Sequence, residues 1–235
     1  MKTLISIFLL LLSLKSMSQD SLIRKGGISI QGNVTNINDN KQTIINSSVS
    51  YDVRMGHKDL LSYITYTNVI KNDVKLSDDI VFRVQPRWIN ENSSFFNYEQ
   101  VSRLYSRKID YRFESALGGG FFLLKKDLIK VTFSYGVIYS NTKYVDDTFI
   151  ETFRHSPRLQ IFGNFKKVSL FVEGLYQPSF KSVDNYNYNW IIKLMTPLTN
   201  KLYFSINSIR TFESYVYTGT AQLNNNLTFG VEYKF

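Results

Sequence analysis

The sequence contains no cysteine, and only two histidines and four prolines among its 235 residues. The absence of cysteine excludes a disulfide scaffold, Cys-ligated zinc, iron–sulfur clusters and thiol catalysis. It also excludes the acylated cysteine that anchors a bacterial lipoprotein. Two histidines leave little room for a His-rich metal site, so we expect no metal and no other cofactor. A mean hydropathy of −0.17 is too polar for a bundle of transmembrane helices.

The first 18 residues are predicted to be a cleaved signal peptide. Lys2 supplies a positive start, Leu4–Leu14 is an apolar run, and Ser16-Met17-Ser18 is a small-x-small cleavage site. The run is too short for a helix that spans a bilayer, which needs about 20 apolar residues. An uncleaved anchor helix is the alternative. We expect an exported protein whose residues 19–235 form one domain.

The charge balance is basic, with 28 Lys and Arg against 19 Asp and Glu. A basic balance often indicates nucleic-acid binding. The basic residues are scattered along this chain, however, and an exported protein meets little nucleic acid. We therefore expect no nucleic-acid partner, and we expect outer-membrane lipid and lipopolysaccharide phosphates to supply the opposite charge.

Beyond the signal the side chains alternate with a period of two, which is typical of β-strands. The pattern is cleanest at the C-terminus, where one face is polar or Gly and the other is apolar. The apolar face consists of Leu227, Phe229, Val231, Tyr233 and Phe235. No stretch after the signal shows a convincing helical stripe.

Twelve strands are predicted from this alternation, at residues 26–35, 42–54, 59–71, 79–90, 95–106, 111–124, 128–140, 149–163, 167–177, 186–196, 201–212 and 226–235. Many reach the roughly 9–11 residues that a transmembrane strand needs. Pro86 and Pro157 fall inside two of them and predict a bulge or a shorter strand. Ten strands is the alternative count.

The connections predict an orientation. With the N-terminus in the periplasm, the even connections are three to five residues long, and they are 54–58, 90–94, 124–127, 164–166 and 197–200. The odd connections, from 36–41 to 213–225, are predicted to be longer, except for a short one at 107–110. Short periplasmic turns with longer outer loops are typical of outer-membrane barrels. The long strands, aromatic residues near strand ends and the final Phe235 favour this fold over a soluble β-sandwich. The fold predicted is a transmembrane antiparallel up-and-down β-barrel in the bacterial outer membrane, present as a monomer.

The last eight residues, Thr228–Phe235, resemble the C-terminal assembly signal of bacterial outer-membrane proteins. Gly230, Tyr233 and Phe235 occupy the Gly and the aromatic positions of that signal. The resemblance implies that the barrel-assembly machinery is a partner during insertion, by pairing with an exposed strand edge.

A second resemblance covers roughly residues 80–180. The residues that carry it are Tyr98, Tyr105, Tyr111-Arg112, Gly118-Gly119-Gly120 and the run Val131–Val137 (VTFSYGV). This pattern resembles the family of salt-induced outer-membrane proteins, known as domain of unknown function 481. That family carries no assigned activity, so the resemblance implies only an outer-membrane barrel.

Charged residues on the polar phase are the candidate lumen-lining residues. They are Arg83, Arg87, Arg112, Glu114, Lys130, Arg154, Arg158, Glu173, Lys193 and Glu232. One interpretation is a narrow channel that selects small anionic solutes. The other is a plugged interior, in which opposite charges from facing walls pair and fill the space. Gly118, Gly120, Gly136 and Gly230 lie on the same inward phase, where they allow either arrangement.

Catalysis is not expected. A Ser–His hydrolase needs a His held beside a Ser, but His57 lies in a predicted turn and His155 on a predicted lipid-facing phase, opposite to Ser156. An outer-membrane lipid hydrolase is therefore a distant alternative. The residues 213–225, with Tyr215 and Tyr217, form either a ligand-contacting loop or an ordinary loop over the barrel mouth. We expect an integral outer-membrane protein with a structural or envelope-stress role.

Overall fold

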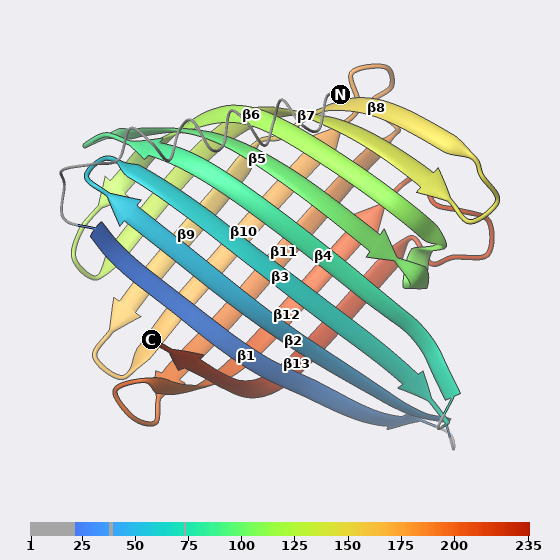
Figure 1. Ribbon diagram of the computed structural model, residues 1–235, viewed down its shortest axis with the longest axis horizontal. Helices are drawn as coiled ribbons and strands as arrows, with labels where there is room; N and C mark the ends of the chain where they lie inside the picture. Colours follow the sequence, from blue (N-terminus) through green and yellow to red (C-terminus); the bar gives the residue numbers. More distant parts are fainter. Residues whose placement is uncertain (1–21, 38–39, 73) are drawn as a thin grey trace.

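The protein is a closed antiparallel barrel in the computed structural model, which describes residues 22–37, 40–72 and 74–235 (Figure 1). These residues form thirteen strands and one 3-10 helix. They are β1 (Leu22–Ile37), β2 (Asn40–Met55), β3 (Lys58–Lys71), β4 (Val74–Ile89), β5 (Ser93–Leu104), η1 (Tyr105–Arg107), β6 (Ile109–Lys125), β7 (Ile129–Tyr144), β8 (Phe149–His155), β9 (Arg158–Phe165), β10 (Val168–Pro178), β11 (Tyr186–Pro197), β12 (Leu202–Glu213) and β13 (Leu223–Lys234). The predicted signal peptide and its cleavage site lie outside the described residues.

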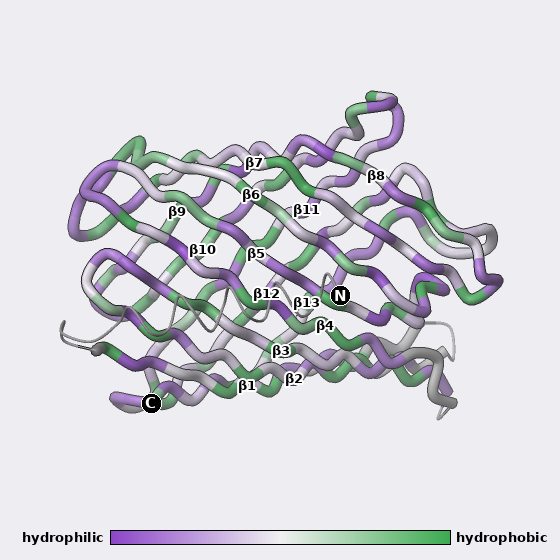
Figure 2. Tube along the Cα trace, turned by 45° about the horizontal axis from the view of Figure 1, so that its top comes forward, coloured by the Kyte–Doolittle hydropathy of each residue, from purple (hydrophilic) through white to green (hydrophobic). Residues whose placement is uncertain are grey.

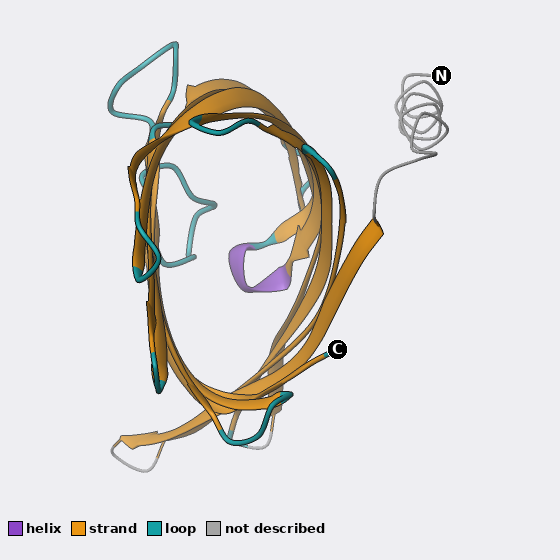
Figure 3. Ribbon diagram, turned by 90° about the vertical axis from the view of Figure 1, so that its left-hand side faces the viewer, coloured by secondary structure: helices purple, strands orange, loops and turns teal. Residues whose placement is uncertain are grey.

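Consecutive strands pair with each other except β8 and β9, which both pair with β7, and β1 pairs with β13 to close the barrel. At this seam the backbone of Gly26 exchanges two hydrogen bonds with that of Phe235, at 2.9 and 3.0 Å. A sheet closed on itself has no edge, which excludes the sandwich. Figure 3 views the barrel from the end and shows an oval outline.

Strands β8 and β9 together occupy one place in the barrel, so the described residues make a twelve-stranded barrel, as predicted. Val137 pairs with His155 in β8, and Ser134 pairs with Arg158 in β9, which is the same register. Ser156 continues that register through two hydrogen bonds with Gly136. The interruption falls at Pro157 because proline has no backbone N–H to donate.

The prediction of a bulge or a shorter strand is confirmed in its second form at Pro157, where the strand is split into β8 and β9, and is wrong at Pro86. Pro86 lies inside β4, opposite Leu60 of β3, and the β4–β5 ladder omits residues 85 and 86 without a change of register. Each proline removes ladder hydrogen bonds but inserts no extra residue, so the register is kept.

The connections differ from the prediction on the outer side. The turns at the end where β13 finishes are short, as expected, and the long connections 179–185 and 214–222 lie at the other end. The β1–β2 ladder, however, continues to Ile37 and Asn40, and the β3–β4 ladder to Lys71 and Val74. Residues 36–37, 40–41 and 74–78, which were predicted to be in loops, belong to the strands instead. The 107–110 connection is therefore not the lone short one on this side.

The outer wall of the barrel is apolar. Large side chains such as Ile30, Phe153 and Trp190 are between 52% and 58% exposed, and they alternate with inward polar residues (Figure 2). A continuous apolar band of this kind is too large for a surface in water and suits the hydrocarbon of a bilayer. No helix among the described residues is long and apolar enough to cross a membrane.

An acid lies on this wall near the middle of β5. Glu99 is the seventh residue of the twelve in β5 and lies on the outward phase, between the inward Tyr98 and Gln100; its Oε1 accepts a hydrogen bond of 2.9 Å from Ser115 Oγ. Acids on a lipid face cost less than the about 2–4 kcal/mol of Lys or Arg. We expect Glu99→Leu to raise the free energy of unfolding by about 1 kcal/mol, measured by urea unfolding in lipid vesicles with Trp88 and Trp190 fluorescence. Glu91→Leu in the exposed β4–β5 turn is the control, and a loss of stability in Glu99→Leu alone contradicts the lipid-facing placement.

Candidate functional site in the barrel lumen

A cluster of aromatic, basic and aliphatic side chains packs together on one wall of the lumen at mid-height. We use "septum" for Tyr63, Arg83, Phe96, Tyr98, Ala116 and Ile138, which come from β3 to β7. The carbon Cζ of Arg83 lies 4.4 Å from the ring centroid of Tyr98 and 5.4 Å from that of Tyr63. This stack places a guanidinium between two rings, a favourable cation–π arrangement.

Hydrogen bonds and close packing hold the septum in place. Arg83 Nε and Nη2 donate to Gln100 Oε1 at 2.9 and 2.6 Å, and Gln100 Nε2 donates to Glu114 Oε2 at 2.7 Å. Tyr98 and Ile138 are each 1% exposed. Side chains that face a lumen reach such values only where other atoms fill the space.

Two inward glycines give the septum its shape. A Cβ added at Gly118 would lie 2.6 Å from Phe96 Cζ, and one added at Gly136 would lie 3.4 Å from the same atom. The ring of Phe96 therefore rests on the bare backbone of β6 and β7. The sequence left open whether the inward glycines widen the lumen, and here the Phe96 ring occupies the space at these two.

Inward side chains on the wall formed by β12, β13 and β1 are packed as well. Ser205 of β12 and Thr228 of β13 point inward and are 0% and 1% exposed. Gln31 of β1 joins them, because its Nε2 donates to Ser205 Oγ at 3.0 Å and its Oε1 accepts from Thr228 Oγ1 at 3.0 Å. Inward side chains at this height are therefore buried on this wall as well as on the septum wall.

An ion-pair cluster reaches across the lumen at the end with the long connections, which we call the outer end. Glu213, the last residue of β12, lies 3.0 Å from Arg107 of η1 and 3.0 Å from Arg112 of β6. Both arginine side chains and the carboxylate are nearly buried. Arg112 and Glu213 are 101 residues apart and come from separate parts of the wall, so their pair is a strut across the lumen. Figure 3 shows η1 inside the outline of the barrel.

Further contacts cover this outer mouth. Arg154 of β8 donates to the backbone oxygens of Gln177 and Asn185 and to Asn185 Oδ1. The ring of Tyr217, in the β12–β13 connection, stacks on Tyr144 with centroids 5.6 Å apart. Of the two interpretations of this connection, the contact favours a loop that folds over the mouth.

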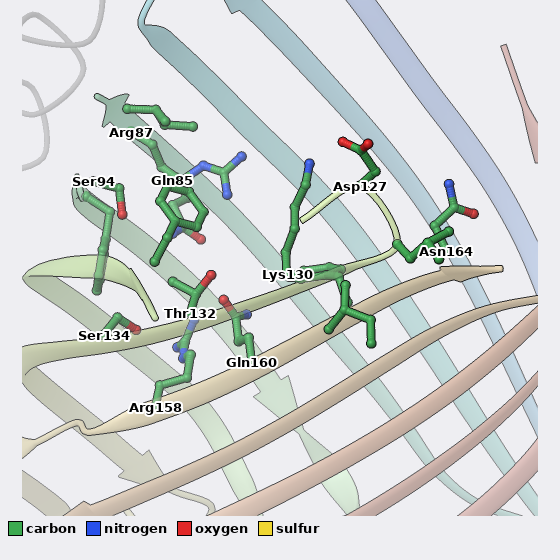
Figure 4. Close-up of a pocket in the computed structure, with 16 residues that line it drawn as sticks. Gln85, Arg87, Ser94, Asp127, Lys130, Thr132, Ser134, Arg158, Gln160 and Asn164 are labelled. Carbon is green, nitrogen blue, oxygen red and sulfur yellow. The ribbon is translucent and has the colours of Figure 1, made fainter. Parts of the chain in front are cut away.

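A cavity of about 390 Å³ opens at the opposite end, among the short turns. We call it the vestibule. It reaches from Asp127 and Leu128 in the β6–β7 turn to Phe96, Ser134 and Arg158 near the septum. Figure 4 shows Lys130, Thr132, Gln160 and Arg158 along its side.

The vestibule is basic. Arg87, Lys130 and Arg158 line it, and Asp127 at the turn is the acid among its lining residues. Arg87 shares Asp59 with Arg54, through contacts of 2.7 and 2.6 Å. Arg158 has a distant partner, with its Nε 3.9 Å from Glu173 Oε2. The arrangement leaves positive charge facing the cavity.

The family model described as "Protein of unknown function, DUF481" matches residues 30–235. The chain belongs to this family. The match confirms the resemblance seen in the sequence and adds no activity, because the family itself has none assigned. No curated protein matches the sequence.

Three solved structures share the fold of this DUF481 chain at low identity. A NanC porin is 8% identical, with a TM-score of 0.57 over 88% of this chain and 100% of that one. An outer-membrane channel from Pseudomonas putida F1 is 12% identical, with a TM-score of 0.55 over 92% and 97%. A KdgM porin, in complex with disordered oligogalacturonate, is 13% identical, with a TM-score of 0.52 over 89% and 99%. They establish an outer-membrane type of barrel fold.

The candidate lumen residues of the DUF481 chain fall into the groups described above. Arg83 and Glu114 belong to the septum network, and Arg112 and Arg154 lie at the outer mouth. Arg87, Lys130 and Arg158 line the vestibule, with Glu173 beside Arg158. Lys193 and Glu232 form an ion pair with each other, and Lys234 is 3.7 Å from the same carboxylate. Most of these charges meet an opposite charge.

The lumen-lining residues predicted from the sequence do not include Glu213, Arg107 and Asp59. Glu213 and Arg107 were assigned to connections, and Asp59 stood at the start of a predicted strand. The alternation that places Ser205 and Asn207 on the inward phase of β12 extends to Glu213. The sequence pattern could therefore have predicted that Glu213 faces the lumen. Arg107 follows no alternation because η1 is a turn of helix, and its inward direction depends on the tertiary fold.

The histidines do not meet a serine in the arrangement a hydrolase needs. His155 Nδ1 contacts the hydroxyl of Tyr135, and its ring packs on Phe180 at 3.8 Å between centroids. Ser156 is buried, on the opposite phase of the strand. His57 is in the β2–β3 turn, and its Nδ1 lies 3.0 Å from the backbone oxygen of Ile89 in β4. Within the described ranges, no group of three or more His, Cys, Asp or Glu could hold a metal ion.

The residues of the C-terminal signal lie at the closing seam. Phe235 covers Gly26, where an added Cβ would meet its ring at 2.5 Å. A Cβ on Gly230 would lie 2.0 Å from the backbone oxygen of Ile30. Tyr233 pairs with Ile28 of β1 and Leu202 of β12. Gly230 and Phe235 therefore serve the packing of the seam in the folded barrel.

Proposed function

We propose that the chain is a monomeric integral outer-membrane barrel with a closed lumen, and that its role is structural, in the envelope, without catalysis. The observation that carries this proposal is the packing at mid-height, where Tyr98, Ile138, Ser205 and Thr228 are at most 1% exposed. A permeating solute needs a water-filled path, and closely packed side chains on both walls oppose one.

Three observations support the outer membrane as the location. The outer wall is apolar, the fold is that of outer-membrane barrels, and the final strand ends on aromatic residues. The barrel-assembly machinery would then insert the chain, and outer-membrane lipid and lipopolysaccharide would surround it.

The test is conductance. We expect purified folded protein in a planar bilayer to give no resolved current steps. Folding is checked first by electrophoresis in SDS with and without boiling, because a folded barrel migrates differently once boiled. Release of the protein by a carbonate wash would contradict the membrane location, and regular current steps would contradict the closed lumen.

A narrow path for small anions is the second candidate. The basic vestibule favours it, and the solved barrels with this fold include porins and a channel. This candidate requires that the septum move to open a path through the lumen. Current steps in the wild-type protein with a preference for chloride over potassium would support this candidate over the first.

A further inference from the structure

We infer that the vestibule is a binding site for a small organic anion, a carboxylate with an apolar body, which enters from the turn end. The inference goes beyond the closed-barrel proposal and does not require it, because a cavity that ends at the septum can bind a ligand and release it on the same side.

The charge on the cavity wall points to an anion. Among the described residues, no hydrogen bond or ion pair is found for Lys130, which is exposed within the vestibule. Arg87 Nε is buried without a hydrogen-bond partner, although its other end contacts Asp59. Arg158 has its acid 3.9 Å away. A carboxylate would complete hydrogen bonds that these donors now lack, and such charge-assisted bonds are the strong ones.

The apolar lining points to the rest of the ligand. Phe96, Phe122 and Phe162 line the vestibule beside the basic side chains. Phe162 points inward on β9, yet it is 45% exposed, and its ring packs on Phe171 at 4.8 Å between centroids. An apolar ring that is exposed to water is costly unless a partner covers it. A flat apolar body would cover it.

Size and order agree with a small molecule. A volume of about 390 Å³ lies at the lower end of the about 300–1,000 Å³ of small-molecule sites. Along β7 and β9 the wall runs inward from the Lys130–Phe162 pair, through Thr132–Gln160, to Ser134–Arg158. The ligand therefore meets a cation and a ring at the mouth, amide and hydroxyl groups next, and a second cation at the floor.

Benzoate is the probe, measured by calorimetry with the folded full chain in nanodiscs and with empty nanodiscs as the blank. We expect saturable binding of benzoate and binding at least about tenfold weaker for benzamide, which lacks the charge, and for acetate, which lacks the ring. Equal binding of benzoate and benzamide would overturn the anion assignment, and equal binding of acetate would overturn the apolar part.

Two variants with matched controls locate the site. We expect Lys130→Gln and Phe162→Ala each to weaken benzoate binding about tenfold. Lys126→Gln, in the exposed β6–β7 turn, and Phe165→Ala, on the outward phase of β9, remove the same groups outside the vestibule. They should bind benzoate as the wild type does. Unchanged binding in Lys130→Gln and Phe162→Ala would overturn the site.

A labelling test does not depend on those variants, because the chain has no cysteine of its own. Thr132→Cys places a thiol in the vestibule. We expect it to react faster with an anionic methanethiosulfonate than with a cationic one, and benzoate to slow the reaction. Equal reaction rates with the two reagents, or no slowing by benzoate, would contradict the inference. The conductance of the barrel is measured separately and tests the closed-barrel proposal.

Discussion

Replacing Arg83 with serine and Tyr98 with alanine together should open the lumen, so that a barrel without resolved conductance gives discrete current steps in a planar bilayer. The two side chains stack on each other at 4.4 Å and fill the centre of the septum. Their removal would join the vestibule to the outer half of the lumen. Both side chains are removed because Arg83, left in place, would still occupy the lumen beside Tyr63.

The chain supplies a matched control. Arg103 and Tyr105 form a second arginine–tyrosine stack at 4.9 Å, and both residues are exposed outside the lumen. Arg103→Ser with Tyr105→Ala makes the same chemical change, and this variant should give no resolved current steps. Loss of the large Tyr98 side chain should cost about 3–5 kcal/mol of stability, so the heat-dependent shift in SDS must show that the variant is folded. A folded Arg83→Ser, Tyr98→Ala variant without current would show that the septum is not the barrier.

The opened barrel also tests the charge of the path. Adding Arg158→Ser should shift the preference toward cations, because Arg158 lies at the floor of the vestibule, where ions would pass. The reversal potential under a salt gradient measures this shift. Unchanged selectivity would mean that the current follows another route.

Glu213→Gln should lower the free energy of unfolding by about 3–5 kcal/mol, the cost of removing one partner from a buried ion pair. Glu213 is 6% exposed, and its carboxylate serves both Arg107 and Arg112. The amide keeps the shape and some hydrogen bonds, but it leaves two buried guanidinium groups without a counter-charge. Urea unfolding in lipid vesicles, followed by Trp88 and Trp190 fluorescence, measures the change.

Asp147→Asn is the control for this substitution. Asp147 forms an ion pair of 2.7 Å with Lys143, but its side chain is 80% exposed. An exposed pair contributes about 0–1 kcal/mol, so this variant should unfold close to the wild type. Adding Arg112→Gln to Glu213→Gln should recover part of the stability by removing one of the two unpaired charges. Equal stability of Glu213→Gln and Asp147→Asn would contradict the strut across the lumen.

The period of two by itself located most of the strands and indicated which way their side chains point, because successive residues of a strand face opposite sides. That rule is local, so Leu227–Phe235 could be assigned to the apolar wall without any knowledge of its neighbours. The count of twelve strands follows from the same pattern, because Pro157 interrupts the hydrogen-bond ladder without changing its register.

Only the tertiary structure decided which inward residues meet. Arg112 and Glu213 are 101 residues apart and pair because the closed barrel places β6 and β12 across the lumen from each other. The Arg83 stack depends on the register of β3, β4 and β5, and the inward turn of η1 that brings Arg107 to Glu213 follows no alternation. The vestibule exists for the same reason: its lining comes from strands whose relative height is set by hydrogen bonding around the whole barrel, which no single segment of sequence contains.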